Sequence, residues 1–236
     1  MKNKQRLKKS AKYVCYVAIM AATLTVGKLA LSFIPNVEVV TLLIICYSST
    51  FGRKYAIPAT LIFCTVEIAI YGFGTWVLLY YIHWNMLSVI SSFALKKQKL
   101  WIATLIAVLC TAFFGVLSTG IDVIFAGAYG VPKSELGKLY SANYVRGIWF
   151  YVVHVVSNLL IVTALYIPLT KVLSKIQNSG NSATNLLQKS SNDNQMQNSF
   201  DETRDAKAES GQTACDAQAL CNHIEPLDKD ENRSDD

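Results

Sequence analysis

Carboxylates are scarce in the first part of this chain, and that scarcity limits what the chain can fold into. Residues 1–175 contain 17 Lys or Arg but only four acidic residues, whereas residues 176–236 contain five basic and 12 acidic residues. The two parts therefore carry formal charges of +13 and −7. A water-soluble globule needs polar surface that so few carboxylates could not provide. We therefore expect lipid to surround the first part.

Apolar runs in this first part predict six membrane-spanning helices. A bilayer helix needs about 17–25 predominantly apolar residues, and only the second run is clearly shorter. Glycine, proline and clusters of charge separate the runs. The predicted spans are residues 12–33, 37–51, 55–72, 76–95, 100–127 and 143–173. The predicted fold class is an all-α integral membrane bundle of six transmembrane helices.

The distribution of basic residues predicts the orientation of this bundle. Cytoplasmic loops carry an excess of Lys and Arg. With the N-terminus inside, 13 basic residues lie on the cytoplasmic side and only two, Lys133 and Lys138, lie outside. Both termini are therefore expected in the cytoplasm of a multi-pass protein of the cell membrane.

Three segments follow from these patterns. Residues 1–11 form a basic cytoplasmic N-terminus, and residues 12–175 form the transmembrane domain. Residues 176–236 are rich in Asn, Ser, Gln and Asp. Such a composition buries too little apolar surface to offset chain entropy, so we expect a disordered cytoplasmic tail.

Ionisable residues inside membrane spans mark candidate functional sites, because they are costly there. In this chain they all fall in the outer halves of the predicted spans. They are Lys28, Glu38, Glu67, His83, Asp122 and Arg146. A proton or ion pathway would need polar groups through the whole membrane thickness. The distribution therefore favours a pocket that opens to the outside.

Helical spacing places further polar residues on one face of the last span. Asn143, Gly147, Tyr151, His154 and Asn158 lie within about 80° of one another at 100° per residue. The alternative is that such polar residues form hydrogen bonds between helices of the bundle.

The two central acidic residues also have two interpretations. Glu67 and Asp122 either contact a ligand or form buried ion pairs with Lys28 or Arg146.

Aromatic residues crowd the outer rim of the third and fourth spans. An interfacial belt is one interpretation, and stacking against a flat ligand is the other. Phe73 and Trp76 lie in or beside a glycine-containing loop, as a lid over a pocket would. The crowded residues are Tyr71, Phe73, Trp76, Tyr80, Tyr81 and Trp84.

A stripe of small residues follows the cytoplasmic half of the first span, at Ala11, Cys15, Ala18, Ala22 and Thr25. Small side chains let another helix approach closely.

This stripe, the six spans with both ends inside, and two segments together resemble the substrate-binding S components of energy-coupling factor (ECF) transporters. The segments are GKLALSFIPNVEVVTLLIICYSSTFG, residues 27–52, and YGFGTW, residues 71–76. The resemblance covers about residues 12–173.

The resemblance implies a protein that captures a vitamin or similar micronutrient from outside. It would dock on a transmembrane scaffold subunit that is driven by two ATPase subunits. Ala18 and Ala22 would face the scaffold, and the loops at residues 35–38, 72–76 and 127–143 would line and cover the ligand. The acidic tail has no counterpart in this family.

Together, these arguments give the set of expected substrate-binding residues. They are Lys28, Asn36, Glu38, Glu67, Tyr71, Phe73, Trp76, His83, Asp122, Arg146, Tyr151, His154 and Asn158. No catalytic residue, metal ligand, cofactor or nucleic-acid partner is expected. The basic residues suit a carboxylate or phosphate, and the acidic residues suit an amine or polar ring edge. The sequence therefore does not determine which substrate binds.

Two other classes of protein are compatible with the sequence. A self-contained secondary transporter would use Glu67 or Asp122 as its coupling-ion site and need no ATPase. An intramembrane enzyme is less favoured, because His83 and His154 lie on separate spans without a metal-hydrolase motif.

Overall fold

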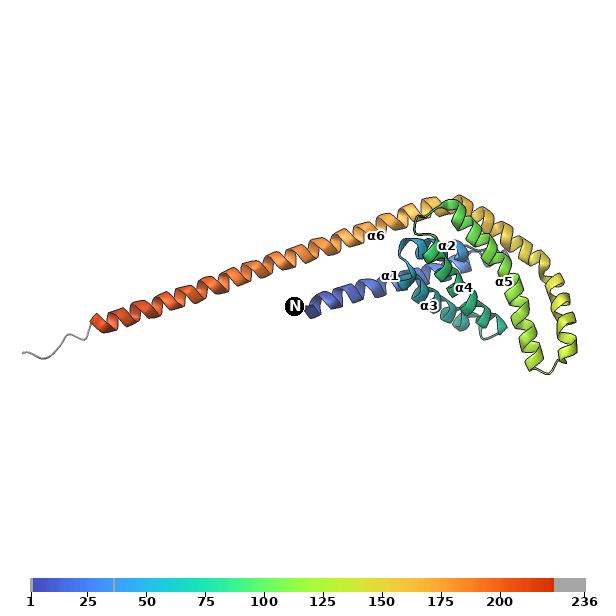
Figure 1. Cartoon of the computed structure of the whole chain (residues 1–236), viewed down its shortest axis with the longest axis horizontal. Helices are drawn as coiled ribbons and strands as arrows, with labels where there is room; N and C mark the ends of the chain where they lie inside the picture. Colours follow the sequence, from blue (N-terminus) through green and yellow to red (C-terminus); the bar gives the residue numbers. More distant parts are fainter. Residues whose placement is uncertain (1, 36, 223–236) are drawn as a thin grey trace, which may run out of the picture. The chain divides into compact units, whose positions relative to one another are not determined.

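The computed structural model describes residues 2–35 and 37–222, which form α-helices and no β-strand (Figure 1). The helices are α1 (Lys2–Ala30), α2 (Val40–Thr50), α3 (Arg53–Tyr71), α4 (Thr75–Ala94), α5 (Leu100–Ala128) and α6 (Lys133–Asn222). The described residues up to Gly180 form one compact unit, and those from Asn181 form a second. The all-α class is therefore confirmed.

Five of these helices are long and apolar enough to cross a membrane: α1 over Ser10–Ala30, α3, α4, α5, and α6 over Lys133–Leu186. This agrees with a membrane protein. The count of six spans and the cytoplasmic placement of both termini stay predictions.

Helix α2 differs from the other predicted spans in length and in burial. Its 11 residues would cover only about 16 Å of the roughly 30 Å hydrocarbon core. It contacts α1, α3, α4 and α5, and eight of its residues are buried, including Leu42, Ile45 and Ser48. A helix that is apolar all round is expected in a protein interior. The second apolar run is thus a short internal helix of the bundle.

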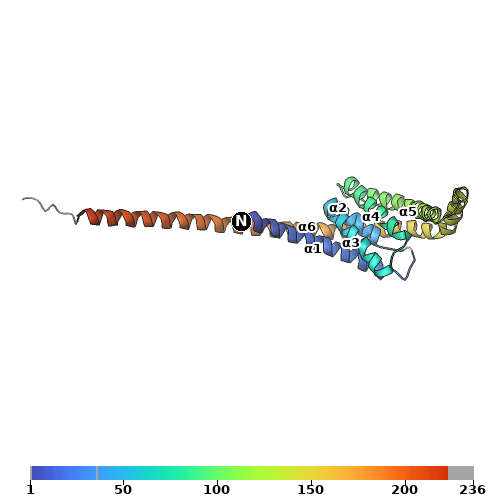
Figure 2. The same cartoon turned by 90° about the horizontal axis from the view of Figure 1, so that it is seen from below.

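The bundle is built around this helix. Helix α1 packs on α3, and α4 packs on α2, α3 and α5 (Figures 1 and 2). Its core includes Leu24, Ile45, Phe63 and Trp84, which are all buried. Many large apolar side chains instead cover the outside, Ile19 and Leu109 among them. Such an outer surface is what a protein surrounded by lipid would present.

A side-chain contact joins α5 to α6. A Cβ atom added to Gly115 would lie 2.7 Å from the ring of Tyr151, so only glycine fits there without a shift of the ring. Tyr151 also shares a hydrogen bond of 3.0 Å with the hydroxyl of Thr119.

Two hydrogen bonds show that the basic connections lie at one end of the bundle. The hydroxyl of Tyr13 donates to the carbonyl of Lys54 at 3.0 Å. The amide of Gln98 donates to Thr50 at 3.5 Å. The 19 residues of α3 span about 28 Å, which places Tyr71 at the opposite end. The positive-inside argument requires basic loops to share one side in this way.

Helix α6 begins at Lys133, within the segment 127–143 that was expected to be a loop covering the ligand, and it continues past residue 175, where the tail was expected to begin. The division between compact units falls after Gly180. Among the described side chains of residues 181–198, all except Thr184 are exposed. A helix without a buried face gains little from packing. Disorder of the tail therefore stays a prediction, and residues 223–236 lie outside the described part of the chain.

Candidate functional site

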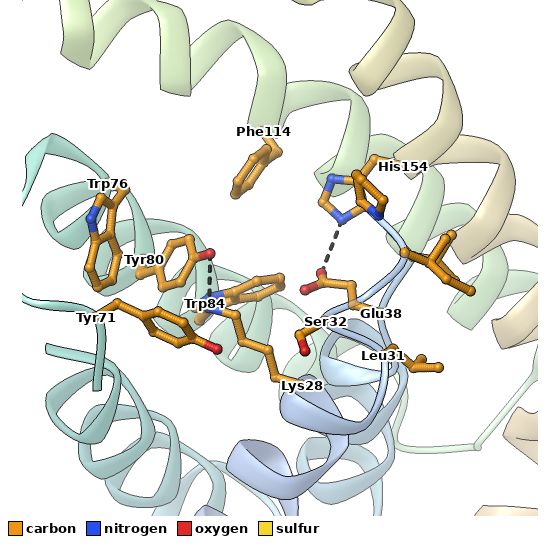
Figure 3. Close-up of a pocket in the computed structure, with 13 residues that line it drawn as sticks. Lys28, Leu31, Ser32, Glu38, Tyr71, Trp76, Tyr80, Trp84, Phe114 and His154 are labelled. Atoms are coloured by element: carbon orange, nitrogen blue, oxygen red, sulfur yellow. Dashed lines mark hydrogen bonds and ion pairs between the residues drawn. The ribbon is translucent and has the colours of Figure 1, made fainter. Parts of the chain in front are cut away.

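A pocket of about 400 Å³ lies where the end of α1, the connection to α2, and the helices α3 to α6 meet (Figure 3). This is the end of the bundle opposite the basic connections. The lining combines charged, aromatic and aliphatic side chains. It consists of Lys28, Leu31, Ser32, Ile34, Pro35, Val37, Glu38, Tyr71, Trp76, Tyr80, Trp84, Phe114 and His154.

One wall contains a cation that is already paired. The ammonium of Lys28 forms an ion pair with Glu67, whose side chain is fully buried on α3. It also donates a hydrogen bond of 3.1 Å to the hydroxyl of Tyr80. The ring centroids of Tyr80 and Tyr71 lie 4.4 Å and 5.3 Å from the nitrogen. Carboxylate and aromatic faces both stabilise a desolvated ammonium, so this wall is electrically neutral overall.

The opposite side of the pocket contains a carboxylate and an imidazole. The Nε2 atom of His154 lies 3.0 Å from Oε1 of Glu38. The hydroxyl of Thr41 donates to the same oxygen at 3.3 Å. Both contacts use one carboxylate oxygen, and Glu38 lines the pocket. Figure 3 shows that Glu38 and His154 face the aromatic residues across the pocket.

Aromatic rings form most of the remaining wall. Trp76 and Tyr80 meet edge to face at 5.1 Å, and Tyr80 and Trp84 do so at 5.9 Å. On the far side, Phe114 meets the ring of His154 edge to face at 5.1 Å. Such rings present flat apolar faces and favour stacking or edge contacts with another ring. The pocket is therefore suited to a planar ligand.

Two predicted residues lie directly behind this lining. His83 is buried, and its ring contacts those of Trp84 and Phe114 at 4.7 Å and 4.9 Å. Asn158 is fully buried and donates to the carbonyl of His154 at 3.1 Å. His83 packs against two rings that line the pocket, and Asn158 binds the backbone of His154.

Other predicted residues lie away from this pocket. Asp122 is exposed and accepts a hydrogen bond of 2.7 Å from Thr75, which ties α5 to the start of α4. Tyr151 packs on α5 as described above. Arg146 and Phe73 are exposed, and Asn36 lies outside the described residues. The polar face of the last helix is therefore divided between the pocket and helix contacts.

The structure brings together five of the predicted residues in the pocket lining: Lys28, Glu38, Tyr71, Trp76 and His154. Glu67, His83 and Asn158 contact that lining from behind.

Eight lining residues were absent from the predicted set, and three of them are aromatic: Tyr80, Trp84 and Phe114. The spacing of Trp76, Tyr80 and Trp84 by four residues places them on one helix face, and that signal could have included two of them. Phe114 lies in an apolar run without any polar signal.

The chain matches no protein family model, no curated protein and no solved structure.

Proposed function

We propose that this protein is the substrate-binding subunit of an ECF-type importer, which captures a vitamin-like compound and docks on a scaffold subunit powered by separate ATPases. The observation that carries the proposal is the pocket at one end of an apolar bundle. Buried charge, an imidazole and several aromatic rings converge on about 400 Å³ there, which is a volume typical of small-molecule sites.

The surface of α1 supports docking on a membrane partner. Ala11, Cys15, Ala18 and Ala22 of the small stripe are exposed, whereas Leu24 and its buried neighbours face the core. The stripe therefore lies on the outside of the bundle, where a second helix could approach closely.

A secondary transporter is the second candidate, and the position of Glu67 favours it. This carboxylate is fully buried, and its Oε1 atom has no hydrogen-bond partner among the described residues. Intramembrane carboxylates of this kind can carry a coupling ion. The two candidates differ in whether uptake requires the ATPases.

The experiment begins with identification of the bound compound by mass spectrometry after purification. Uptake is then measured in cells that express the scaffold and ATPase subunits, with and without ATPase activity. We expect Ala18→Trp combined with Ala22→Trp to abolish uptake and co-purification with the scaffold, and to leave ligand binding by the solitary protein intact.

A matched control uses the exposed flank beside this stripe of α1. Ile19 and Val26 are 62% and 64% exposed and lie about 40–100° around the helix from Ala18 and Ala22. The variant Ile19→Trp with Val26→Trp should retain docking. Normal transport by the alanine variant would refute the docking assignment, and uptake without ATPases would favour the secondary transporter.

A further inference from the structure

We propose that the pocket binds a planar aromatic compound that carries a positively charged nitrogen, with this nitrogen at Glu38 and the ring among Tyr80, Trp84 and Phe114. The proposal deepens the proposed function, because it rests on the same pocket as the capture site. It narrows the substrate class that the sequence leaves open between anions and amines.

The first argument is the balance of charge around the pocket. The charge of Lys28 is matched by Glu67 within the wall. The partners of Glu38 are an imidazole and the hydroxyl of Thr41. Lys28, the other basic residue of the described lining, is paired with Glu67, so Glu38 has no lysine or arginine as its partner, and both of its contacts use Oε1. The Glu38 side chain is 14% exposed, and a cationic partner stabilises a partly buried carboxylate, so the cation of a ligand would bind on this side of the pocket.

The second argument is the cost of binding an anion in this pocket. Lys28 is the only basic side chain in the described lining apart from His154. The ammonium of Lys28 already donates to Glu67 and Tyr80, so it has one further N–H for an anionic ligand. Its charge is already balanced by Glu67, which is fully buried, and the anion would also face the carboxylate of Glu38. The pocket therefore disfavours a carboxylate or phosphate.

The third argument is the shape and chemistry of the walls. Trp84 is nearly fully buried and is flanked by Tyr80 on one side and by Phe114 at 6.2 Å. Figure 3 shows the labelled rings of these residues around the space that Glu38 faces. Aromatic faces attract cations as well as other rings. A planar ring with a positively charged nitrogen would pair with Glu38 and contact the aromatic rings at the same time.

The test uses three probes that share an indole ring and differ in terminal charge: tryptamine, tryptophol and indole-3-acetate. Binding to the purified full-length protein is measured by calorimetry, and benzamidine and benzoate serve as a second, smaller pair. We expect the cation to bind about ten- to hundredfold tighter than the neutral probe, as a charged hydrogen bond would require. The anions should bind most weakly.

The variant Glu38→Gln should remove the advantage of the cations and leave the neutral probe unaffected. Glu135→Gln is the matched control, because Glu135 is exposed and pairs with Lys138 outside the pocket. The probe series on the unmodified protein tests the charge preference even where Glu38→Gln lowers stability. Tighter binding of the anions, binding of no probe, or an unchanged cation preference in Glu38→Gln would overturn the proposal.

A failure of this proposal can be distinguished from a failure of the proposed function. Anion-selective binding together with ATPase-dependent uptake would overturn the substrate class alone. Cation-selective binding that depends on Glu38, without any association with a scaffold, would overturn the importer assignment alone.

Discussion

Breaking the ion pair between Lys28 and Glu67 should destabilise the empty protein more than any other single polar substitution near the pocket. Glu67 is fully buried and Lys28 is 19% exposed, so the loss of one partner leaves an uncompensated charge in a dry environment. Measured losses for such pairs are about 3–5 kcal/mol. For a unit of this size, that free energy corresponds to a melting temperature about 6–20 °C lower.

The assay is thermal unfolding of the ligand-free protein in lipid nanodiscs, followed by intrinsic fluorescence. The variants are Lys28→Met, Glu67→Gln and the combination of both. Because the double variant contains no unpaired charge, we expect it to be more stable than the sum of the two single losses predicts. Lys138→Met is the control, since its pair with Glu135 is exposed and worth at most about 1 kcal/mol. Single variants as stable as the unmodified protein, or additive losses, would refute the reasoning.

Two further predictions concern packing and the tail. Gly115→Val should lower the free energy of unfolding by about 1–3 kcal/mol, because the valine side chain would clash with the ring of Tyr151. Gly120→Val is the control and should cost less, because no atom lies within 4 Å of a Cβ at that site. Equal melting temperatures of the two variants would contradict the contact between Gly115 and Tyr151. Truncation after Gly180, where the first compact unit ends, should leave ligand affinity unchanged, and a loss of affinity in a folded truncated protein would show that the tail contributes to capture.

The sequence by itself determined the class of the protein and the boundaries of α4 and α5, but not those of α6, which begins at Lys133 and not at residue 143. The predicted spans 76–95 and 100–127 lie within one residue of α4 (Thr75–Ala94) and α5 (Leu100–Ala128). Hydropathy succeeds here because a backbone without water must satisfy its hydrogen bonds within the helix, so that each span needs a long apolar run. The short second run also indicated an exceptional element, and α2 is that element.

The sequence placed the polar residues at one end, but it left their partners undecided. Lys28 and Glu67 were open to both ligand binding and ion pairing, and the packing of α1 on α3 brings them into contact. The pair of Glu38 and His154 joins residues 116 positions apart. Periodicity reports only which face of its own helix a residue occupies, so no local pattern could predict this pair.

The aromatic wall was decided by tertiary structure alone. Tyr80 and Trp84 have the composition of an interfacial belt, and Phe114 resembles any apolar residue of a membrane helix. Helices α4, α5 and α6 nevertheless converge so that Phe114 lies between Trp84 and His154. Side-chain contacts such as that of Tyr151 with Gly115 involve two distant segments at once. Hydropathy predicts which helices are long and apolar enough to cross a membrane, whereas the shape of the pocket follows from how the helices pack against one another.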